Sequence, residues 1–174
     1  MNEIDKMNKY KPALLEWIET MFLHAEEKKW YETYHAFDIH GVISKPDYRK
    51  SGKEFEINYY PYAKETLQFL SKNRPDMIMF IFTSSYPNEI QSYMEQFEKD
   101  EIFFKYVNEN PEINDSKGNF GCYDKKPYFN SYWEDKAGFR PLIDWQPIYE
   151  YFVNSEYKPD PTWNFKTIEN YHKK

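Results

Sequence analysis

Residues 34–42, YHAFDIHGV, are the stretch of sequence that decides the fold. A short, largely apolar run ends at Phe37, and Asp38 and Gly41 follow it closely. Such a run, stopped by turn-forming residues, is typical of a strand that is buried on both faces of a parallel sheet. Asp38 is therefore expected at the end of a buried strand, where open α/β sheets bind their ligands.

The rest of the chain alternates between helical and extended patterns. Apolar residues recur at three- and four-residue steps in the helical segments, and residues 77–82, MIMFIF, form the clearest buried strand. Strands that alternate with helices predict an α/β fold, a three-layer, Rossmann-like arrangement of a parallel sheet with helices on both faces. The expected helices are 12–28, 61–70, 88–98 and 145–153, and the expected strands are 34–37, 77–82, 102–107 and 129–133.

Length and composition indicate a single domain over residues 1–174. Hydrophobic residues make up 40 % of the chain and charged residues 30 %, which is the composition of an ordered globular protein.

The helix near 12–28 precedes the first strand as an N-terminal addition. Residues 44–60 carry turn formers and then an alternating pattern, so we expect a small lid there. The gaps between the strands are too short to hold a large cap domain.

Charge and cysteine content exclude several classes of function. The net charge of −6 argues against a duplex nucleic-acid partner, because such proteins carry a basic face that releases counterions from phosphates. Cys122 is the only cysteine, so the chain has no internal disulfide and no multi-cysteine zinc site. No stretch approaches the roughly 20 apolar residues of a membrane span, and the start lacks a signal-peptide pattern. We therefore expect a cytoplasmic protein with no membrane partner.

Polar residues follow three of the expected strands. Two polar residues follow each of these strands, and each such pair has an ordinary structural explanation when it is taken alone. The first would be a turn, the second a helix N-cap and the third a solvated charged turn. The carboxyl ends of parallel strands lie along one edge of a sheet, so the three pairs together predict one site. The residues are Asp38 and His40, Thr83 and Ser84, and Glu134 and Asp135.

These clusters resemble the motifs of the haloacid dehalogenase-like (HAD) superfamily, in particular its small capless nucleotidases and phosphatases. Residues 37–42, FDIHGV, resemble the first motif, an apolar strand followed by Asp-x-Asp-Gly-Thr/Val, with His40 in place of the second Asp. The match covers residues 34 to about 140 in family order. The later motifs correspond to residues 80–84 (FIFTS), to Lys125 or Lys126, and to Glu134 and Asp135.

The resemblance implies a magnesium-dependent hydrolase of small phosphomonoesters, with nucleotides as the first substrate class. Asp38 would be the nucleophile and form an aspartyl-phosphate, because a divalent cation between its carboxylate and the phosphate neutralises both. Mg²⁺ takes hard oxygen ligands in octahedral geometry. The implied metal ligands are Asp38, the backbone carbonyl of His40, and Asp135 or Glu134. The implied phosphate-binding residues are Thr83, Ser84, and Lys125 or Lys126.

His40 is the main departure from the family pattern. The second Asp of the family's phosphatases protonates the leaving group and then activates water, and an imidazole is suited to both steps near neutral pH. A histidinium would, however, repel the metal. The sequence therefore leaves two functions open: a HAD-type phosphatase with His40 as its acid and base, or a non-catalytic phosphate- or metal-binding interaction protein that kept the scaffold.

Overall fold

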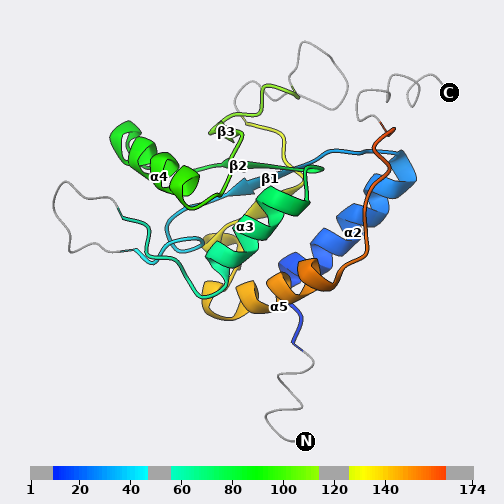
Figure 1. The fold of residues 1–174 in the computed structure, drawn as a ribbon, viewed down its shortest axis with the longest axis horizontal. Coiled ribbons are helices and arrows are strands. Elements are labelled where there is room, and N and C mark those ends of the chain that lie inside the picture. Colours follow the sequence, from blue (N-terminus) through cyan, green and yellow to red (C-terminus); the bar gives the residue numbers. More distant parts are fainter. Residues whose placement is uncertain (1–9, 47–55, 114–125, 164–174) are drawn as a thin grey trace, which may run out of the picture.

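The computed structural model describes residues 10–46, 56–113 and 126–163 (Figure 1). Within these residues one four-stranded sheet has the order β3-β2-β1-β4, and every strand pair in it is parallel. The predicted α/β fold with a parallel sheet is therefore confirmed. The strands are β1 (Thr33–Phe37), β2 (Met77–Ile81), β3 (Tyr106–Val107) and β4 (Ser131–Trp133), and the helices are α2 (Ala13–Lys28), α3 (Ala63–Asn73), α4 (Pro87–Lys99) and α5 (Pro141–Asn154).

The edge strand β3 is the element that differs most from its prediction. The sequence predicts a strand over 102–107, but only its last two residues pair with β2. The N–H of Ile102 donates instead to the carbonyl of Phe97 at 2.8 Å, and the N–H of Phe103 donates to Ser71 Oγ at 2.9 Å. Ile102 is buried, so its apolar side chain contributes to the core from a loop rather than from a strand.

The sheet separates two hydrophobic clusters of different make-up. All five residues of β1 are buried, as expected for a central parallel strand. Phe37 faces the larger cluster, to which α2, α3, α4 and α5 all contribute. Figure 1 shows α2, α3 and α5 on one side of the sheet. Tyr34 and Phe80 face the smaller cluster. In the described part of the chain this second face is covered by the end of α2 and by non-helical segments that include Trp30.

The described ends of the expected lid pair with each other close to the end of β1. Ser44 and Tyr59 form an antiparallel bridge, and the N–H of Lys45 donates to the carbonyl of Asn58 at 2.9 Å. Residues 47–55, the middle of that segment, lie outside the described residues. Within the residues that are described, no separate cap domain covers the sheet.

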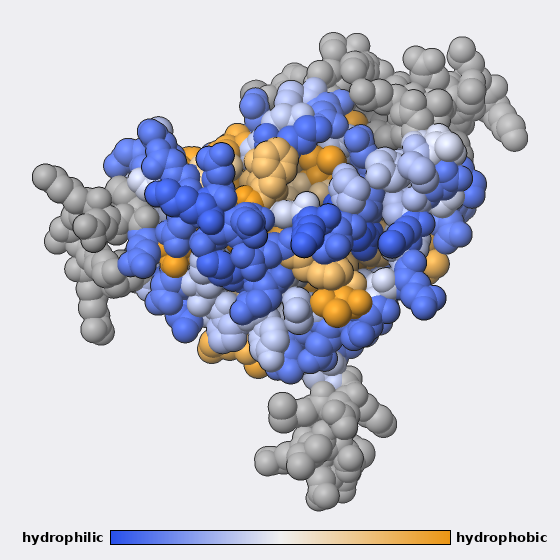
Figure 2. Space-filling view, in the orientation of Figure 1, coloured by the Kyte–Doolittle hydropathy of each residue, from blue (hydrophilic) through white to orange (hydrophobic). Residues whose placement is uncertain are grey.

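Hydrophilic side chains cover most of the molecular face in Figure 2, with smaller hydrophobic patches between them. None of the helices in the described ranges is long and apolar enough to cross a membrane. The most exposed large apolar side chains belong to different elements rather than to one of them: Leu23, Tyr86, Phe103 and Leu142.

A buried hydrogen-bond chain joins β1 to β4. His35 is fully buried, with its Nε2 2.9 Å from Thr33 Oγ1 and its Nδ1 2.7 Å from Ser131 Oγ. Ser131 Oγ also accepts a hydrogen bond from Trp133 Nε1 at 2.9 Å. Burial lowers the pKa of His35 to about 3, and the charge of Arg74 adds to this effect. The imidazole of His35 is therefore neutral in the folded protein near neutral pH.

His35 should make the protein less stable as the pH falls. The unfolded chain protonates His35 below about pH 6.5, but the folded protein does not until about pH 3. This contribution to the free energy of unfolding is therefore complete above about pH 6.5 and is lost at lower pH, by about 2 kcal/mol at pH 5. Urea unfolding at pH 7 and pH 5 measures it. His35→Gln should flatten the pH dependence, and an equal dependence in both proteins would contradict this account.

Candidate functional site

The candidate site lies where three neighbouring strands end. The N–H of Asp38 donates to the carbonyl of Trp133 at 3.0 Å, and the N–H of Phe82 donates to the carbonyl of Phe37 at 2.8 Å. Backbone pairing thus continues beyond the strands and holds the starts of the three loops together. A cavity of about 830 Å³ opens there, and the predicted site residues that line it are Asp38, His40, Thr83, Ser84 and Asp135.

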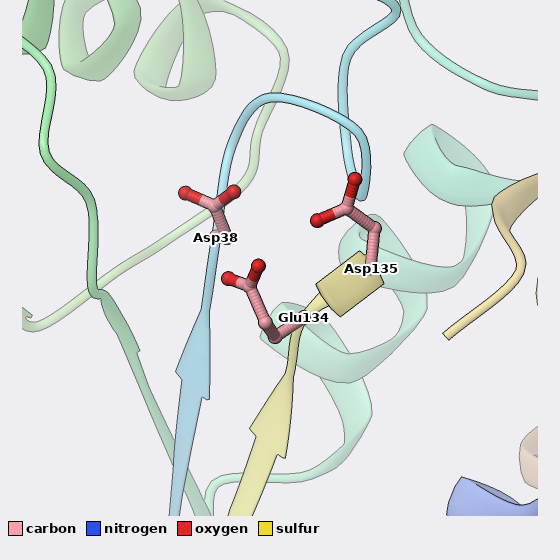
Figure 3. A group of neighbouring side chains, drawn as sticks. All are labelled: Asp38, Glu134 and Asp135. Carbon is pink, nitrogen blue, oxygen red and sulfur yellow. The ribbon is translucent and has the colours of Figure 1, made fainter. Parts of the chain in front are cut away.

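Three carboxylates converge at this edge of the sheet (Figure 3). Asp38 extends from the end of β1, and Glu134 and Asp135 extend from the residues after β4. One oxygen of each carboxylate lies within 4.8 Å of the others. Burial raises the pKa of Asp38 to about 6; a hydrogen bond from the N–H of Ile39 opposes this shift, and the charge of Glu134 adds to it. Asp38 is still ionised above about pH 6, so near neutral pH the cluster carries negative charge, and this charge favours a cation.

Lys136, which the sequence analysis did not identify, lies beside these carboxylates at the start of the 3₁₀ helix η2 (Asp135–Ala137). Its Nζ is 3.0 Å from Glu134 Oε1 and 3.2 Å from Asp135 Oδ1, and these hydrogen bonds raise the pKa of Lys136. Lys136 also lines the cavity with Asp38. Its position directly after the two acids in the sequence was a signal that could have been used.

The two lysines that the resemblance implies do not both fall within the described residues. Lys125 lies outside them. Lys126 is exposed, and its Nζ lies over the ring of Phe129, 5.8 Å from the ring centroid. Lys126 is not among the residues that line the cavity at Asp38, so the structure does not bring it together with the predicted site.

Thr83 and Ser84 lie in the loop between β2 and α4 and do not cap the helix. The N-cap residue is Tyr86, whose backbone N–H donates to Glu89 Oε2 at 2.9 Å. The backbone N–H of Thr83 donates to Asn108 Oδ1 at 2.8 Å, which ties this loop to the end of β3. The helix N-cap explanation of this pair is therefore wrong, and both residues line the cavity instead.

Both ring nitrogens of His40 have polar neighbours, of which Tyr93 also lines the cavity. Nε2 lies 3.0 Å from the hydroxyl of Tyr93, and Nδ1 lies 3.5 Å from Ser85 Oγ. Burial lowers the pKa of His40, while the charge of Glu89 opposes that shift. The neutral imidazole is thus favoured over the histidinium, and a neutral ring does not repel a metal.

A second cavity of about 560 Å³ adjoins the first at Asp38. It adds aromatic walls, because Phe82 and Tyr132 line it and make a T-shaped contact with ring centroids 5.6 Å apart. His40 lines the first cavity but not the second. The residues that line both cavities are Asp38, Thr83, Ser84 and Lys136.

The carboxylate cluster suits Mg²⁺. In octahedral coordination at about 2.1 Å, ligand oxygens are separated by about 3 Å when adjacent and about 4 Å when opposite. The oxygens of Asp38, Glu134 and Asp135 lie within 4.8 Å of one another, so small side-chain rotations would bring them to these separations, and carboxylates are the hard ligands that this ion prefers. These three side chains therefore fit the ion. The contribution of the His40 carbonyl stays a prediction.

Gly41 is required by the path of the loop that follows Asp38. Its backbone φ angle of +84° is one that residues other than glycine rarely adopt. A Cβ at this position would lie 2.5 Å from Oδ2 and 2.9 Å from Cγ of Asp135. Figure 3 shows this loop beside the Asp135 carboxylate. Glycine thus allows the two strand ends to approach each other.

Gly41→Ala should destabilise the protein by about 3 kcal/mol, because the strained backbone and the overlap with Asp135 act together. Gly138→Ala is the matched control, since its φ is +103° but a Cβ there would have no heavy atom within 4 Å. It should cost only the backbone term, about 1 kcal/mol. Urea unfolding measures the loss in free energy of unfolding for both variants. Equal losses would show that the close approach of Gly41 to Asp135 does not contribute to the cost of Gly41→Ala.

Comparison with known proteins identifies a fold but no family. No family model and no curated protein matches the chain. A solved structure of a conserved protein from Bacteroides thetaiotaomicron is similar, with a TM-score of 0.50 and 20 % identity over 70 % of this chain and 90 % of that one. At this identity the similarity supports the α/β fold alone.

Proposed function

We propose that this chain is a magnesium-dependent phosphomonoester hydrolase of the HAD-like type. The observation that carries the proposal is the meeting of Asp38, Thr83 and the two acids after β4 at the ends of three parallel strands, around two adjoining cavities. A buried carboxylate, two further carboxylates and a hydroxyl form the set that an aspartyl-phosphate mechanism needs. The fold alone would not indicate a reaction, so the proposal depends on this site.

Asp38 is the nucleophile of the proposed reaction. Its carboxylate oxygen attacks the phosphorus, the bond from phosphorus to the ester oxygen breaks, and that oxygen takes a proton from the histidinium form of His40, which becomes neutral. Water then attacks the aspartyl-phosphate while His40 takes a proton from it, and the bond from phosphorus to Asp38 breaks. Inorganic phosphate leaves, and the carboxylate is restored.

Other residues of the cavity bind the phosphate and balance its charge. The hydroxyls of Thr83 and Ser84 donate to phosphoryl oxygens, and Lys136 supplies positive charge at the same edge. Asp38, Glu134 and Asp135 would hold Mg²⁺, which neutralises the nucleophile and the phosphate when it is bound.

The larger cavity is the proposed site for the leaving group. His40 lines only that cavity, so a leaving group that takes its proton from His40 extends into it. A volume of about 830 Å³ falls within the range of about 300–1,000 Å³ found for small-molecule sites. Polar side chains, including Lys45, Asn58 and Glu89, surround it. We therefore propose a hydrophilic phosphomonoester, with nucleoside 5′-phosphates as the first class to test.

A panel of phosphomonoesters assayed with Mg²⁺ and with EDTA tests this function. We expect phosphate release from at least one nucleotide or sugar phosphate, and its loss in EDTA. No release from any ester would overturn the hydrolase proposal. If Mg²⁺ nevertheless raised the melting temperature, as binding to the folded state alone requires, the non-catalytic binding protein would be the better account.

Lys136→Ala should lower kcat/KM by roughly 100-fold, because it removes the positive charge beside the carboxylates and the phosphate. Lys126→Ala is the matched comparison, since Lys126 is the described lysine that the family resemblance implies. We expect it to change kcat/KM by less than roughly twofold. Steady-state kinetics of both variants decide the assignment, and a larger loss in Lys126→Ala would restore Lys126 as the phosphate-binding lysine.

A further inference from the structure

We propose that Tyr93 is a positioning residue, which holds Nε2 of His40 so that Nδ1 exchanges the proton with the leaving group. The inference rests on the proposed function, because it specifies how its acid and base is oriented. The observations that carry it are the two unequal contacts of the His40 ring and the different rigidity of their partners.

The contact at Nε2 is the firm one. Tyr93 Oη lies 3.0 Å from Nε2, and the two rings make a T-shaped contact with centroids 5.5 Å apart. Tyr93 is only 5 % exposed and lies on the buried face of α4, one turn before the fully buried Phe97. A buried aromatic side chain on a helix has few alternative rotamers, so it fixes the partner that it touches.

The contact at Nδ1 is the loose one. Ser85 Oγ lies 3.5 Å from Nδ1, at the limit of a hydrogen bond, in a loop rather than on a helix. Thr83 Oγ1 donates to the same Ser85 Oγ at 3.2 Å. Nδ1 therefore faces the loop that would bind the phosphate, and a substrate oxygen near Thr83 can replace Ser85 without moving Tyr93.

This arrangement specifies the tautomer of the neutral ring. If the Tyr93 hydroxyl accepts from Nε2–H, the lone pair of the neutral ring lies on Nδ1, where the Ser85 hydroxyl can donate to it while accepting from Thr83. Nδ1 can then take up a proton, and the resulting histidinium can donate it to the leaving group. The opposite assignment leaves no lone pair on Nδ1 to take a proton from water, so we infer the Nε2–H form.

Kinetics of Tyr93→Phe test the positioning role. We expect a roughly 5- to 10-fold lower kcat on an alkyl phosphate, the effect of one hydrogen bond, and less than a twofold change on an aryl phosphate that departs without protonation. In a His40→Ala background the same substitution should have no further effect, because Tyr93 acts through His40. Tyr106→Phe, which removes a hydroxyl bonded to Glu112 at 2.7 Å away from the cavity, is the control. Equal losses on both esters, or additive losses, would overturn the role.

A second measurement does not depend on activity. Nitrogen-15 NMR of labelled histidine, with His40→Ala to assign the signals, reports which nitrogen of His40 carries the proton. We expect the Nε2–H form in the wild type and a larger share of the Nδ1–H form in Tyr93→Phe. The Nδ1–H form in the wild type, or the same ratio of forms in both proteins, would overturn the inference. If no ester is hydrolysed, the proposed function fails, and the NMR result still decides whether Tyr93 holds Nε2.

Discussion

Asp38→Asn should lower kcat for phosphomonoester hydrolysis by roughly 10⁴-fold or more, because an amide cannot form the aspartyl-phosphate. The variant should fold, since the side chain keeps its shape and loses a charge whose burial is unfavourable, as the raised pKa of Asp38 indicates. Loss of this buried charge should leave the melting temperature without Mg²⁺ unchanged or higher. Rates from single-turnover assays, compared with melting curves, separate loss of chemistry from loss of structure.

Asp160→Asn is the control for this substitution. Asp160 is exposed, lies away from the cavity and bonds to Thr162, so its amide should retain wild-type turnover. If Asp38→Asn kept more than about a tenth of the wild-type kcat, the nucleophile would have to be another group.

His40→Ala should lower kcat by roughly 100-fold for an alkyl phosphate and by much less for an aryl phosphate. An alkoxide is a poor leaving group and needs the proton, whereas a phenolate departs without it. The firm contact of His40 with Tyr93 and its position in the larger cavity give the reason to expect this difference. The ratio of kcat for the two ester types is the measured quantity.

His40→Asp and His24→Ala complete that experiment. The first introduces the acid that HAD-like phosphatases carry at the corresponding motif position and should recover alkyl phosphate turnover with magnesium dependence. The second removes an exposed imidazole on α2 and should leave the ratio unchanged. Equal kcat values for wild type and His40→Ala on the alkyl ester would exclude the acid and base role.

The central part of the fold could be predicted because its signals are local. The apolar runs ending at Phe37 and Phe82 identify the two central strands, and turn residues mark their ends. The edge strand was predicted too long, because Ile102 is apolar for the sake of core packing from a loop. Helices on both faces of the sheet were expected from the alternation of elements alone, whereas in the described residues the face of Tyr34 and Phe80 is covered by the end of α2 and by non-helical segments. Which face a loop covers depends on tertiary packing, which periodicity does not encode.

The candidate site was predictable where it depends on strand ends and was missed where it depends on distant packing. Asp38, Thr83 and Asp135 each follow a strand, so the topology alone brings them together. Tyr93 reads as an ordinary core residue of a helix, and only the structure brings its hydroxyl to His40. Lys136 was not predicted, because the family pattern implies the earlier pair Lys125 and Lys126 for this role.

Capture of the covalent intermediate tests the central claim most directly. Wild-type protein mixed with a hydrolysed phosphomonoester and Mg²⁺, then quenched in acid within milliseconds, should gain the mass of one phosphoryl group. Peptide analysis should locate that group on Asp38, and Asp38→Asn should show no gain. Hydrolysis without any covalent phosphoryl group, or with the group on another residue, would contradict the account.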